Sequence, residues 1–229
     1  MSKRLKLLAG AAMVATTLGA GIAHASPITF NVTVWAAHTP NANATTPTQQ
    51  ALPDNPINAQ PALAASFTFA GLPDWQNAAG SANTFSNFVQ PTSAVSNLTF
   101  YNNLVNKKDF TLSTPNFGAV SLFELSFTTT TSLSGTILHD DGISLWNSDN
   151  SKDLVDSSAP TNKIPTNFLV GPGTYNLWYV EANGAPAVLD FTNVENIPVP
   201  EPGSLLLLGT GLIGLGLVLR QPKKDRVIT

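Results

Sequence analysis

The chain has 229 residues, with 14 acidic and 11 basic side chains and no cysteine, which excludes disulfides and a thiol nucleophile. Seven of the basic residues lie in the first six and last ten positions, so the segment Ser26 to Val199 carries four lysines against twelve acidic residues, a net charge of −8. This charge argues against nucleic acid or anionic lipid as a partner, because either would require basic patches. The segment is long enough for one hydrophobic core.

The N-terminus is typical of a cleaved secretory signal peptide. Three basic residues precede an apolar segment and an Ala-x-Ala site: Lys3, Arg4 and Lys6, then Leu7 to Ile22, then Ala23-His24-Ala25. We predict that residues 1–25 form a signal helix that is removed after Ala25. An uncleaved N-terminal anchor is the alternative, and the small residues that end the apolar segment argue against it.

The first half of the exported segment alternates between strand patterns and irregular stretches. Residues 28–34 alternate apolar and polar side chains, which predicts a strand with one buried face. Residues 38–61 contain five prolines, so we predict a long exposed loop, with a linker between two subdomains as the alternative. Residues 66–69 resume the strand pattern, and residues 74–92 read as another irregular stretch.

The second half is denser in strand patterns. Short runs of β-branched and aromatic residues are separated by turn residues, at 95–101, 109–112, 120–127, 133–139, 143–146, 174–181 and 187–194. The exported segment shows no amphipathic helix of useful length. The sequence therefore predicts one all-β domain over residues 26–197, an antiparallel β-sandwich of jelly-roll-like type with long Pro/Asn-rich loops.

One acidic pair within this domain could bind an ion. Asp140 and Asp141 are followed by Gly142. Adjacent side chains of an extended strand point to opposite faces, so both carboxylates could serve one ion only in a loop conformation. The other interpretation is a type I′ hairpin turn, for which Asp-Gly is a favoured pair.

The surrounding sequence resembles a known domain. A strand ending in Asp140-Asp141-Gly142 is followed by residues 173–181, which read Gly-x-Tyr-x-Leu-x-Tyr-x-Glu, and then by Gly184 and a further strand. Residues 120–194 in this way resemble the protective-antigen-type β-sandwich domain of adhesins, toxins and glycosidases. The resemblance implies that Asp140 and Asp141 help to hold a calcium ion that in turn contacts sugar hydroxyls.

A second oxygen-rich stretch does not form a calcium-binding EF-hand. Asn147, Asp149, Ser151 and Asp153 place oxygens at every second residue. However, Lys152 stands where the glycine of the calcium loop is required, and no bidentate glutamate follows at the right distance. We therefore predict a solvated loop over residues 147–156.

Catalytic motifs are absent from the exported segment. His38 and His139 are its two histidines, and neither a Gly-x-Ser-x-Gly elbow nor a His-Glu-x-x-His helix accompanies them. We predict that the protein is not an enzyme. A glycan-active enzyme with two carboxylates drawn from Glu124, Glu181 and Asp141 is an alternative, because such pairs leave no spacing in the sequence.

Two tryptophans are candidates for stacking on sugar rings. Trp146 and Trp178 lie at a strand end or out of phase with the main apolar neighbours of their strands. Exposed indole rings at these positions would bind a glycan. The other interpretation is that both rings belong to the core, as most aromatic side chains of a sandwich do.

The C-terminus has three parts over residues 198–229. The motif Val199-Pro200-Glu201-Pro202 precedes an uncharged apolar span, Gly203 to Leu219, and a basic tail, residues 220–229, with Arg220, Lys223 and Lys224. As a helix the span would cover roughly 25 Å, so we predict a transmembrane helix with its basic tail on the cytoplasmic side. A buried C-terminal helix is the alternative, although the span lacks a polar face.

This arrangement resembles the PEP-CTERM sorting signal of Gram-negative bacteria. The resemblance implies processing near residues 200–202 by an exosortase, an integral-membrane transpeptidase-like cysteine protease. The partners are then the secretion machinery, the exosortase and, during processing, the inner membrane. We expect a membrane-anchored precursor that afterwards reaches the cell surface or the extracellular space.

The predicted role is structural or adhesive, in the envelope or the extracellular polysaccharide matrix of a biofilm. The alternatives are a calcium-assisted glycan-binding module and a glycan-active enzyme. Calcium is the one cofactor considered, and polysaccharide is the expected ligand of the adhesive role.

Overall fold

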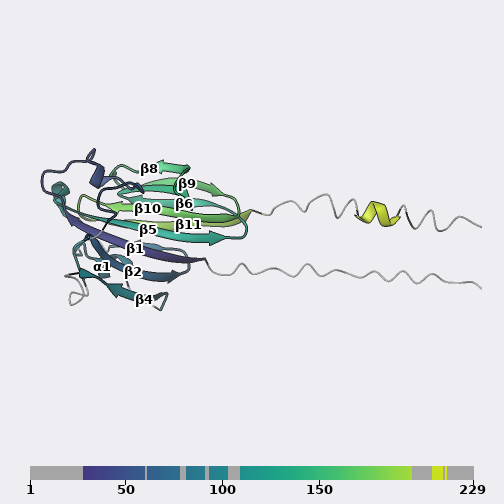
Figure 1. The fold of residues 1–229 in the computed structure, drawn as a ribbon, viewed down its shortest axis with the longest axis horizontal. Coiled ribbons are helices and arrows are strands. Elements are labelled where there is room, and N and C mark those ends of the chain that lie inside the picture. Colours follow the sequence, from purple (N-terminus) through teal and green to yellow (C-terminus); the bar gives the residue numbers. More distant parts are fainter. Residues whose placement is uncertain are drawn as a thin grey trace, which may run out of the picture.

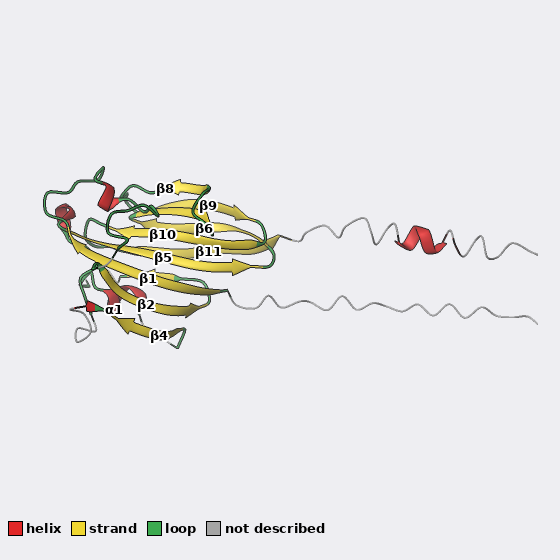
Figure 2. Cartoon of the chain, in the orientation of Figure 1, coloured by secondary structure: helices red, strands yellow, loops and turns green. Residues whose placement is uncertain are grey.

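The protein forms a sandwich of two antiparallel sheets (Figure 1). The computed structural model describes residues 28–59, 61–77, 81–90, 93–102, 109–197, 208–213 and 215. All the strands named within this part of the chain lie between residues 29 and 197. The predicted all-β fold with antiparallel sheets is confirmed, and helices are short and lie outside the sheets (Figure 2).

The larger sheet has seven strands in the order β4-β2-β1-β5-β10-β7-β8. These are β1 (Thr29–His38), β2 (Leu63–Ala70), β4 (Val95–Phe100), β5 (Ala119–Thr129), β7 (Gly142–Asn147), β8 (Asp153–Ser157) and β10 (Gly173–Glu181). The smaller sheet has four strands in the order β3-β11-β6-β9. These are β3 (Asp74–Gln76), β6 (Ser132–Asp140), β9 (Ile164–Val170) and β11 (Val188–Ile197).

The main hydrophobic core lies between the two sheets. Alternation along β1 sends Phe30, Val32 and Val34 inward, where each is at most 2% exposed. Trp75 of the short strand β3 packs against Phe67, Phe69, Phe88 and Phe123, at ring-centroid distances of 5.1 to 6.4 Å. Each such buried aromatic side chain contributes about 1.5–3 kcal/mol, so this aromatic cluster is a main source of stability.

A second hydrophobic cluster covers the outer face of the larger sheet. Trp35 and Trp178 stack there with their ring centroids 6.0 Å apart, and Ala51 and Ile57 from the loop 39–62 are buried in the same cluster. The prediction of an exposed loop is therefore wrong for its middle part. Apolar residues between the prolines are enough to hold the loop on the sheet.

Several elements differ from the sequence prediction. The strands β3, β8 and β9 and the helix α1 (Phe85–Val89) were not predicted, and residues 109–112 contain only an isolated bridge at Thr111. β3 has three residues and β9 begins with Ile-Pro-Thr-Asn, so neither shows the apolar alternation that identifies a strand. Pairing with a longer neighbour is what makes each of them extended.

The two ends of the sandwich are distinct. Figure 1 shows that β1 begins and β11 ends at the same end of the molecule. β11 has ten residues, so its first residue lies about 30 Å from its last one. The opposite end carries the turns that precede β5, β7 and β11.

The targeting segments lie largely outside the described residues. This applies to the predicted signal peptide (1–25), to the motif 199–202, to the basic tail, and to most of the predicted span Gly203 to Leu219. Residues 208–213 and 215 are helical, with exposed leucines at 208, 212 and 215. Within the described part of the chain, no helix combines the length and apolar character that a membrane crossing requires.

Candidate functional site

The acidic pair lies where the chain passes from one sheet to the other. Asp140 is the last residue of β6, in the smaller sheet, and Gly142 is the first of β7, in the larger sheet. The interpretation as a type I′ hairpin turn is therefore wrong, because the two strands do not pair. The Asp140–Asp141 peptide is cis. Gly142 fits here because a Cβ atom would overlap the carbonyl group of Ser158.

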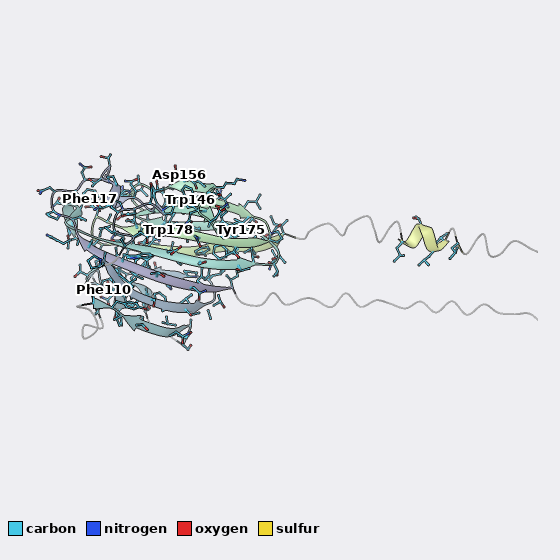
Figure 3. All side chains as sticks on the ribbon, viewed as in Figure 1. Phe110, Phe117, Trp146, Asp156, Tyr175 and Trp178 are labelled. Atoms are coloured by element: carbon cyan, nitrogen blue, oxygen red, sulfur yellow. The ribbon has the colours of Figure 1, made fainter. Side chains whose placement is uncertain are left out.

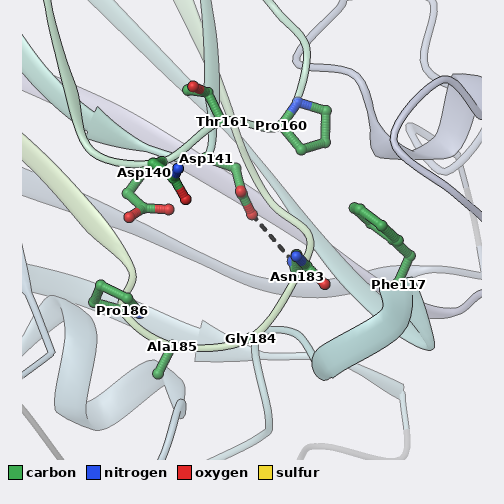
Figure 4. Close-up of a pocket in the computed structure, with 10 residues that line it drawn as sticks. Phe117, Asp140, Asp141, Pro160, Thr161, Asn183, Gly184, Ala185 and Pro186 are labelled. Carbon is green, nitrogen blue, oxygen red and sulfur yellow. Dashed lines mark hydrogen bonds between the residues drawn. The ribbon is translucent and has the colours of Figure 1, made fainter.

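Both carboxylates border one hollow of about 410 Å³. Its walls come from four segments: Phe117; Asp140 and Asp141; Pro160, Thr161 and Asn162; and Asn183, Gly184, Ala185 and Pro186. Figure 4 shows the two aspartates, Thr161 and Asn183 around this space. Among the residues that the structure describes, no lysine, arginine or histidine lines the hollow. Its polar groups are therefore carboxylates, amides and a hydroxyl.

Asp141 is fixed by the backbone of a neighbouring loop. It is 5% exposed, and its Oδ2 accepts hydrogen bonds from the N–H groups of Ala182 (2.7 Å) and Asn183 (3.1 Å). Burial raises the pKa of Asp141, and the hydrogen bonds from these two N–H groups act in the opposite direction. One carboxylate is thus held in a single orientation beside the hollow.

The pKa of Asp140 is raised to about 6. Burial is the main cause, the nearby Asp141 carboxylate adds to it, and Lys163 lowers it through a backbone hydrogen bond and its charge. Two partly buried carboxylates side by side repel each other. A cation in the hollow would relieve that repulsion.

A buried polar network lies beneath the hollow. Glu181 is fully buried, and its Oε1 accepts hydrogen bonds from Ser113 Oγ (2.7 Å) and Asn83 Nδ2 (3.0 Å). Ser113 Oγ in turn accepts a hydrogen bond from the N–H group of Gly184 (2.7 Å). The network therefore connects the segment before α1 and the segment before β5 to the loop that holds Asp141.

The same network indicates that Glu181 is uncharged. Tyr179 Oη lies 2.6 Å from the carbonyl oxygen of Asp140 and 3.0 Å from Glu181 Oε2. The phenol has one hydrogen, and a carbonyl oxygen can only accept. The tyrosine hydrogen goes to Asp140, so the second bond needs a proton on Glu181. Burial and the Asp141 charge raise the pKa of Glu181 well above its ordinary value.

His139 has a structural position. It is fully buried. Its Nδ1 lies 2.5 Å from the carbonyl oxygen of Asp141, and its Nε2 lies 2.7 Å from Thr166 Oγ1. Burial lowers its pKa. Both ring nitrogens are engaged, so this residue positions the backbone of the acidic pair and does not face the hollow.

Phe117 forms the apolar wall of the hollow. It follows Asn116 in a turn where both residues have positive φ angles, 62° and 58°. Such angles are rare for a bulky residue and cost of order 1–3 kcal/mol each. The turn is fixed by hydrogen bonds from Asn116 N to Asn183 Oδ1 (3.0 Å) and from Thr39 Oγ1 to the Phe117 carbonyl (2.7 Å). Figure 4 shows the ring projecting toward the hollow.

The predicted tryptophans do not line the hollow. Trp178 is 1% exposed and stacked on Trp35, so the expectation that it offers a face to a sugar is wrong. Its strand phase places it under the loop 39–62. Trp146 is half-buried, and its Nε1 donates to Ser144 Oγ (2.7 Å). Figure 3 shows Phe117 at the end of the sandwich and both tryptophans farther along it.

Two of the carboxylates considered for catalysis, Glu124 and Glu181, lie apart, whereas Asp141 is close enough to Glu181 to raise its pKa. Glu181 pairs with Ser121 along β10 and β5, and Glu124 is three residues farther along β5. An odd separation puts Glu124 and Glu181 on opposite faces of the sheet.

The loop after Trp146 is closed by its own hydrogen bonds, since Asn147 Oδ1 accepts from Ser151 N and Lys152 N. Its second half forms β8 instead of a solvated loop.

The oxygen atoms around the hollow are suited to a hard cation, although few of them belong to carboxylates. Among the residues that the structure describes, no group of three or more His, Cys, Asp or Glu side chains is arranged to hold a metal. The described lining residues offer two carboxylates with amide, hydroxyl and carbonyl oxygens, and none of them is a histidine, cysteine or methionine. This chemistry fits calcium, which accepts neutral oxygens and water beside carboxylates.

Comparison with known proteins identifies the C-terminal segment. Residues 198–222 match the family model of the PEP-CTERM protein-sorting motif. The chain carries a PEP-CTERM sorting signal. Searches of curated proteins and of solved structures found no match.

The PEP-CTERM match confirms the resemblance seen in the sequence. It includes Val199 to Pro202, the apolar span and the start of the basic tail, and it leaves the sandwich without a counterpart. The motif implies recognition by an exosortase, so the protein is exported through a membrane-anchored precursor. What the sandwich does after export has to be argued from its own residues.

Sequence reasoning missed one wall of the site in this PEP-CTERM protein. Phe117 stands in Pro115-Asn116-Phe117-Gly118, an aromatic residue between turn formers. That pattern predicts an exposed turn, and an aromatic side chain in it is a signal that sequence analysis could have used. The other walls, at residues 160–162 and 183–186, carry no such signal.

Proposed function

We propose that the exported protein is an adhesive component of the cell surface or matrix, whose sandwich binds a glycan with the help of calcium at the Asp140–Asp141 hollow. The observation that carries this proposal is the position of both carboxylates on one hollow. Their repulsion disfavours the empty, doubly charged state. A bound cation reverses that penalty.

In this proposal calcium is held by Asp140 and Asp141, with further oxygens from Thr161, Asn162 and Asn183. Calcium takes six to eight oxygen ligands. The two aspartates supply fewer oxygen ligands than calcium requires. Coordination positions therefore remain for water or for hydroxyl groups of a ligand. When bound, the ion supplies a positive charge that polyhydroxylated ligands can coordinate.

The apolar wall complements this polar one. Phe117 lies across the hollow from Asp141, and Pro160 and Pro186 add further apolar surface to the lining. A sugar ring has an apolar face and a rim of hydroxyls, so it can contact the aromatic ring and the cation at once. The backbone cost of the Phe117 turn is consistent with a functional position.

The location of the hollow favours adhesion. It lies at the end of the sandwich opposite to the one from which Ile197 leads into the sorting motif (Figure 1). As long as the C-terminal segment is attached to a surface, the hollow lies about 30 Å beyond the point where the chain leaves the sandwich. Adhesive domains need such an orientation.

Binding is favoured over hydrolysis. Hydrolysis requires two carboxylates on opposite sides of a scissile bond, about 5 to 9.5 Å apart. The hollow has its two aspartates on one wall and a phenylalanine opposite. This arrangement resembles a binding cradle more closely than a catalytic pair.

The test uses residues 26–197, which contain both hydrophobic clusters and the described strands. The segment is applied to a panel of immobilised neutral and acidic glycans in millimolar calcium or in a chelator. We expect retention in calcium and release by the chelator, and loss of retention in Asp141→Asn. The matched control is Asp149→Asn, an exposed acid of the loop after β7, which should bind like the wild type.

Equal retention with and without calcium would contradict the role of the ion. No retention on any glycan would contradict the adhesive function and leave a structural role in the matrix. Melting temperatures of each variant are measured in parallel, so that a loss of binding can be separated from a loss of folding.

A further inference from the structure

A second hollow of about 400 Å³ lies beside the first one. It is formed mainly by the loop 39–62, outside the part of the chain that suggested a sugar-binding domain. Its lining consists of Ala44, Thr45, Pro47, Gln50, Leu52, Asp54, Asn55 and Ala159. The two hollows have similar volumes, and each is within the usual range of small-molecule sites.

The two hollows share one boundary. Ala159 lines the second hollow and Pro160 lines the first, so consecutive residues separate them. The N–H group of Ala51 donates a 2.9 Å hydrogen bond to the carbonyl of Ser158, which ties the loop 39–62 to this boundary. A ligand longer than one unit that crosses the boundary would occupy both spaces.

The second hollow has a fixed shape. Asn55 Nδ2 donates to the carbonyls of Thr48 (3.1 Å) and Gln50 (2.6 Å). Gln50 Nε2 donates to the carbonyl of Ala44 (2.6 Å). The side chains that line the hollow therefore also hold the loop together. A preformed site loses little conformational entropy when a ligand binds.

The chemistry of both hollows favours a neutral ligand. The described residues that line the two hollows include no lysine, arginine or histidine, and the exported segment has a net charge of −8. The second hollow combines Thr45 and Asp54 with the apolar side chains of Pro47 and Leu52. Hydroxyl-binding groups beside apolar surface are what a neutral sugar ring requires.

We propose that the two hollows form adjoining subsites for one extended neutral oligosaccharide, with one part of the ligand at the acidic pair and the next part in the hollow of the loop 39–62. This proposal rests on the proposed function for its first subsite. It adds the class of ligand: an internal stretch of a neutral polysaccharide, in preference to a single terminal sugar or an acidic polymer.

The test measures affinity against ligand length. Residues 26–197 in millimolar calcium are titrated with neutral oligosaccharides of one to six hexose units and with uronic-acid oligomers of the same lengths. We expect at least a tenfold gain in affinity from the monosaccharide to the longer neutral chains, and no binding of the acidic ones. The variant Ala44→Trp, which fills the second hollow, should lose this gain and keep the monosaccharide affinity.

A matched control and a second variant keep the test decisive. Ala59→Trp adds the same bulk to an exposed position of the same loop that does not line the hollow, and it should behave like the wild type. Asp54→Ala removes a polar group of the hollow without adding bulk, and it should lower the gain with length several-fold. Unchanged melting temperatures show that the loop remains in place.

The outcomes separate the two proposals. Affinity that does not depend on length in the wild type, or a gain with length that survives in Ala44→Trp, overturns the second subsite and leaves the calcium site standing. Tighter binding of the acidic oligomers overturns the ligand class. Long chains that bind equally well in a chelator, and lose affinity in Ala44→Trp, support the second hollow and contradict the calcium role. Absence of binding at any length overturns both.

Discussion

The sequence offers two candidate ligand sites, one at Asp140–Asp141 and one at Trp178. In the fold, the first borders an open hollow and the second is buried. Four segments distant in the sequence leave an open polar hollow around the two aspartates. At the outer face, one loop covers the tryptophans and places Trp178 in a second hydrophobic cluster. The residue type alone did not distinguish them.

The difference teaches that exposure is decided by the segments that cross over a strand. Trp178 is buried because Ala51 and Ile57 add apolar contacts above the sheet. The aspartates border a hollow because they lie between β6 and β7, where the chain changes sheets, although Asp141 itself is 5% exposed. Variants of each region should therefore affect stability in one case and binding in the other.

The largest effect is expected for Trp178→Ala. The substitution removes a fully buried ring that stacks on Trp35 with the ring centroids 6.0 Å apart, which costs about 3–5 kcal/mol of unfolding free energy. Urea denaturation of residues 26–197 measures the loss, with the half-buried Trp146→Ala as the smaller matched change. A variant of Trp178 that keeps its stability but loses glycan binding would reverse our view of the outer face.

Phe117→Ala should show the opposite behaviour. The ring is half-buried and packs at the edge of the second hydrophobic cluster, so its loss should cost less stability than the loss of Trp178. We expect about a fivefold loss of glycan affinity, since an aromatic contact is worth about 1 kcal/mol. Calcium affinity should not change. Equal loss of glycan affinity in Trp146→Ala would move the aromatic wall from Phe117 to the predicted tryptophan.

The calcium-free protein should lose stability as the pH rises from about 4 to about 6. The pKa of Asp140 in the folded state is about 6, above its ordinary value of 3.8. The folded state therefore binds more protons than the unfolded state in this window, and the unfolding free energy falls with increasing pH. Asp141 and Glu181 act in the same direction, because burial raises the pKa of each.

The check is urea denaturation at several pH values in a chelator. Asp140→Asn should flatten the dependence by about 1–2 kcal/mol, less than the full shift because solvent screens a half-buried group. Calcium should remove most of the remaining decline. Stability that rises over this range would mean that the carboxylates are stabilised without a cation.

The smallest effect is expected for Glu181→Gln. Glu181 accepts from Ser113 and Asn83, and its Oε2 lies 3.0 Å from Tyr179 Oη, to which a protonated carboxyl can donate. A glutamine amide can make the same hydrogen bonds. We expect a change of less than about 1 kcal/mol near neutral pH, whereas Glu181→Ala should cost about 3 kcal/mol by leaving buried donors without a partner. A large loss in the glutamine variant would show that the buried carboxyl is charged.

The sequence was informative where local pattern and environment agree. The alternation along residues 28–34 identified β1, and the three-part C-terminus identified the sorting motif. The strand β9 was not predicted, because Pro165 and Asn167 interrupt its apolar pattern. The strand exists through its pairing with β6, which is a long-range contact.

The site, like the fold, has parts that the sequence predicts and parts that it does not. Asp140 and Asp141 could be named because they are adjacent, but their surroundings could not. Phe117, Thr161 and Asn183 reach the hollow through the topology of the two sheets. The role of Phe117 depends on a backbone conformation, and that of Glu181 on a network whose members are up to 98 residues apart.

Calorimetric titration of residues 26–197 with calcium tests the central claim most directly. We predict binding at a single site, with a rise in melting temperature, that disappears in Asp141→Asn and persists in Asp149→Asn. No heat and no change in melting temperature at millimolar calcium in the wild type would contradict the calcium site and the function built on it.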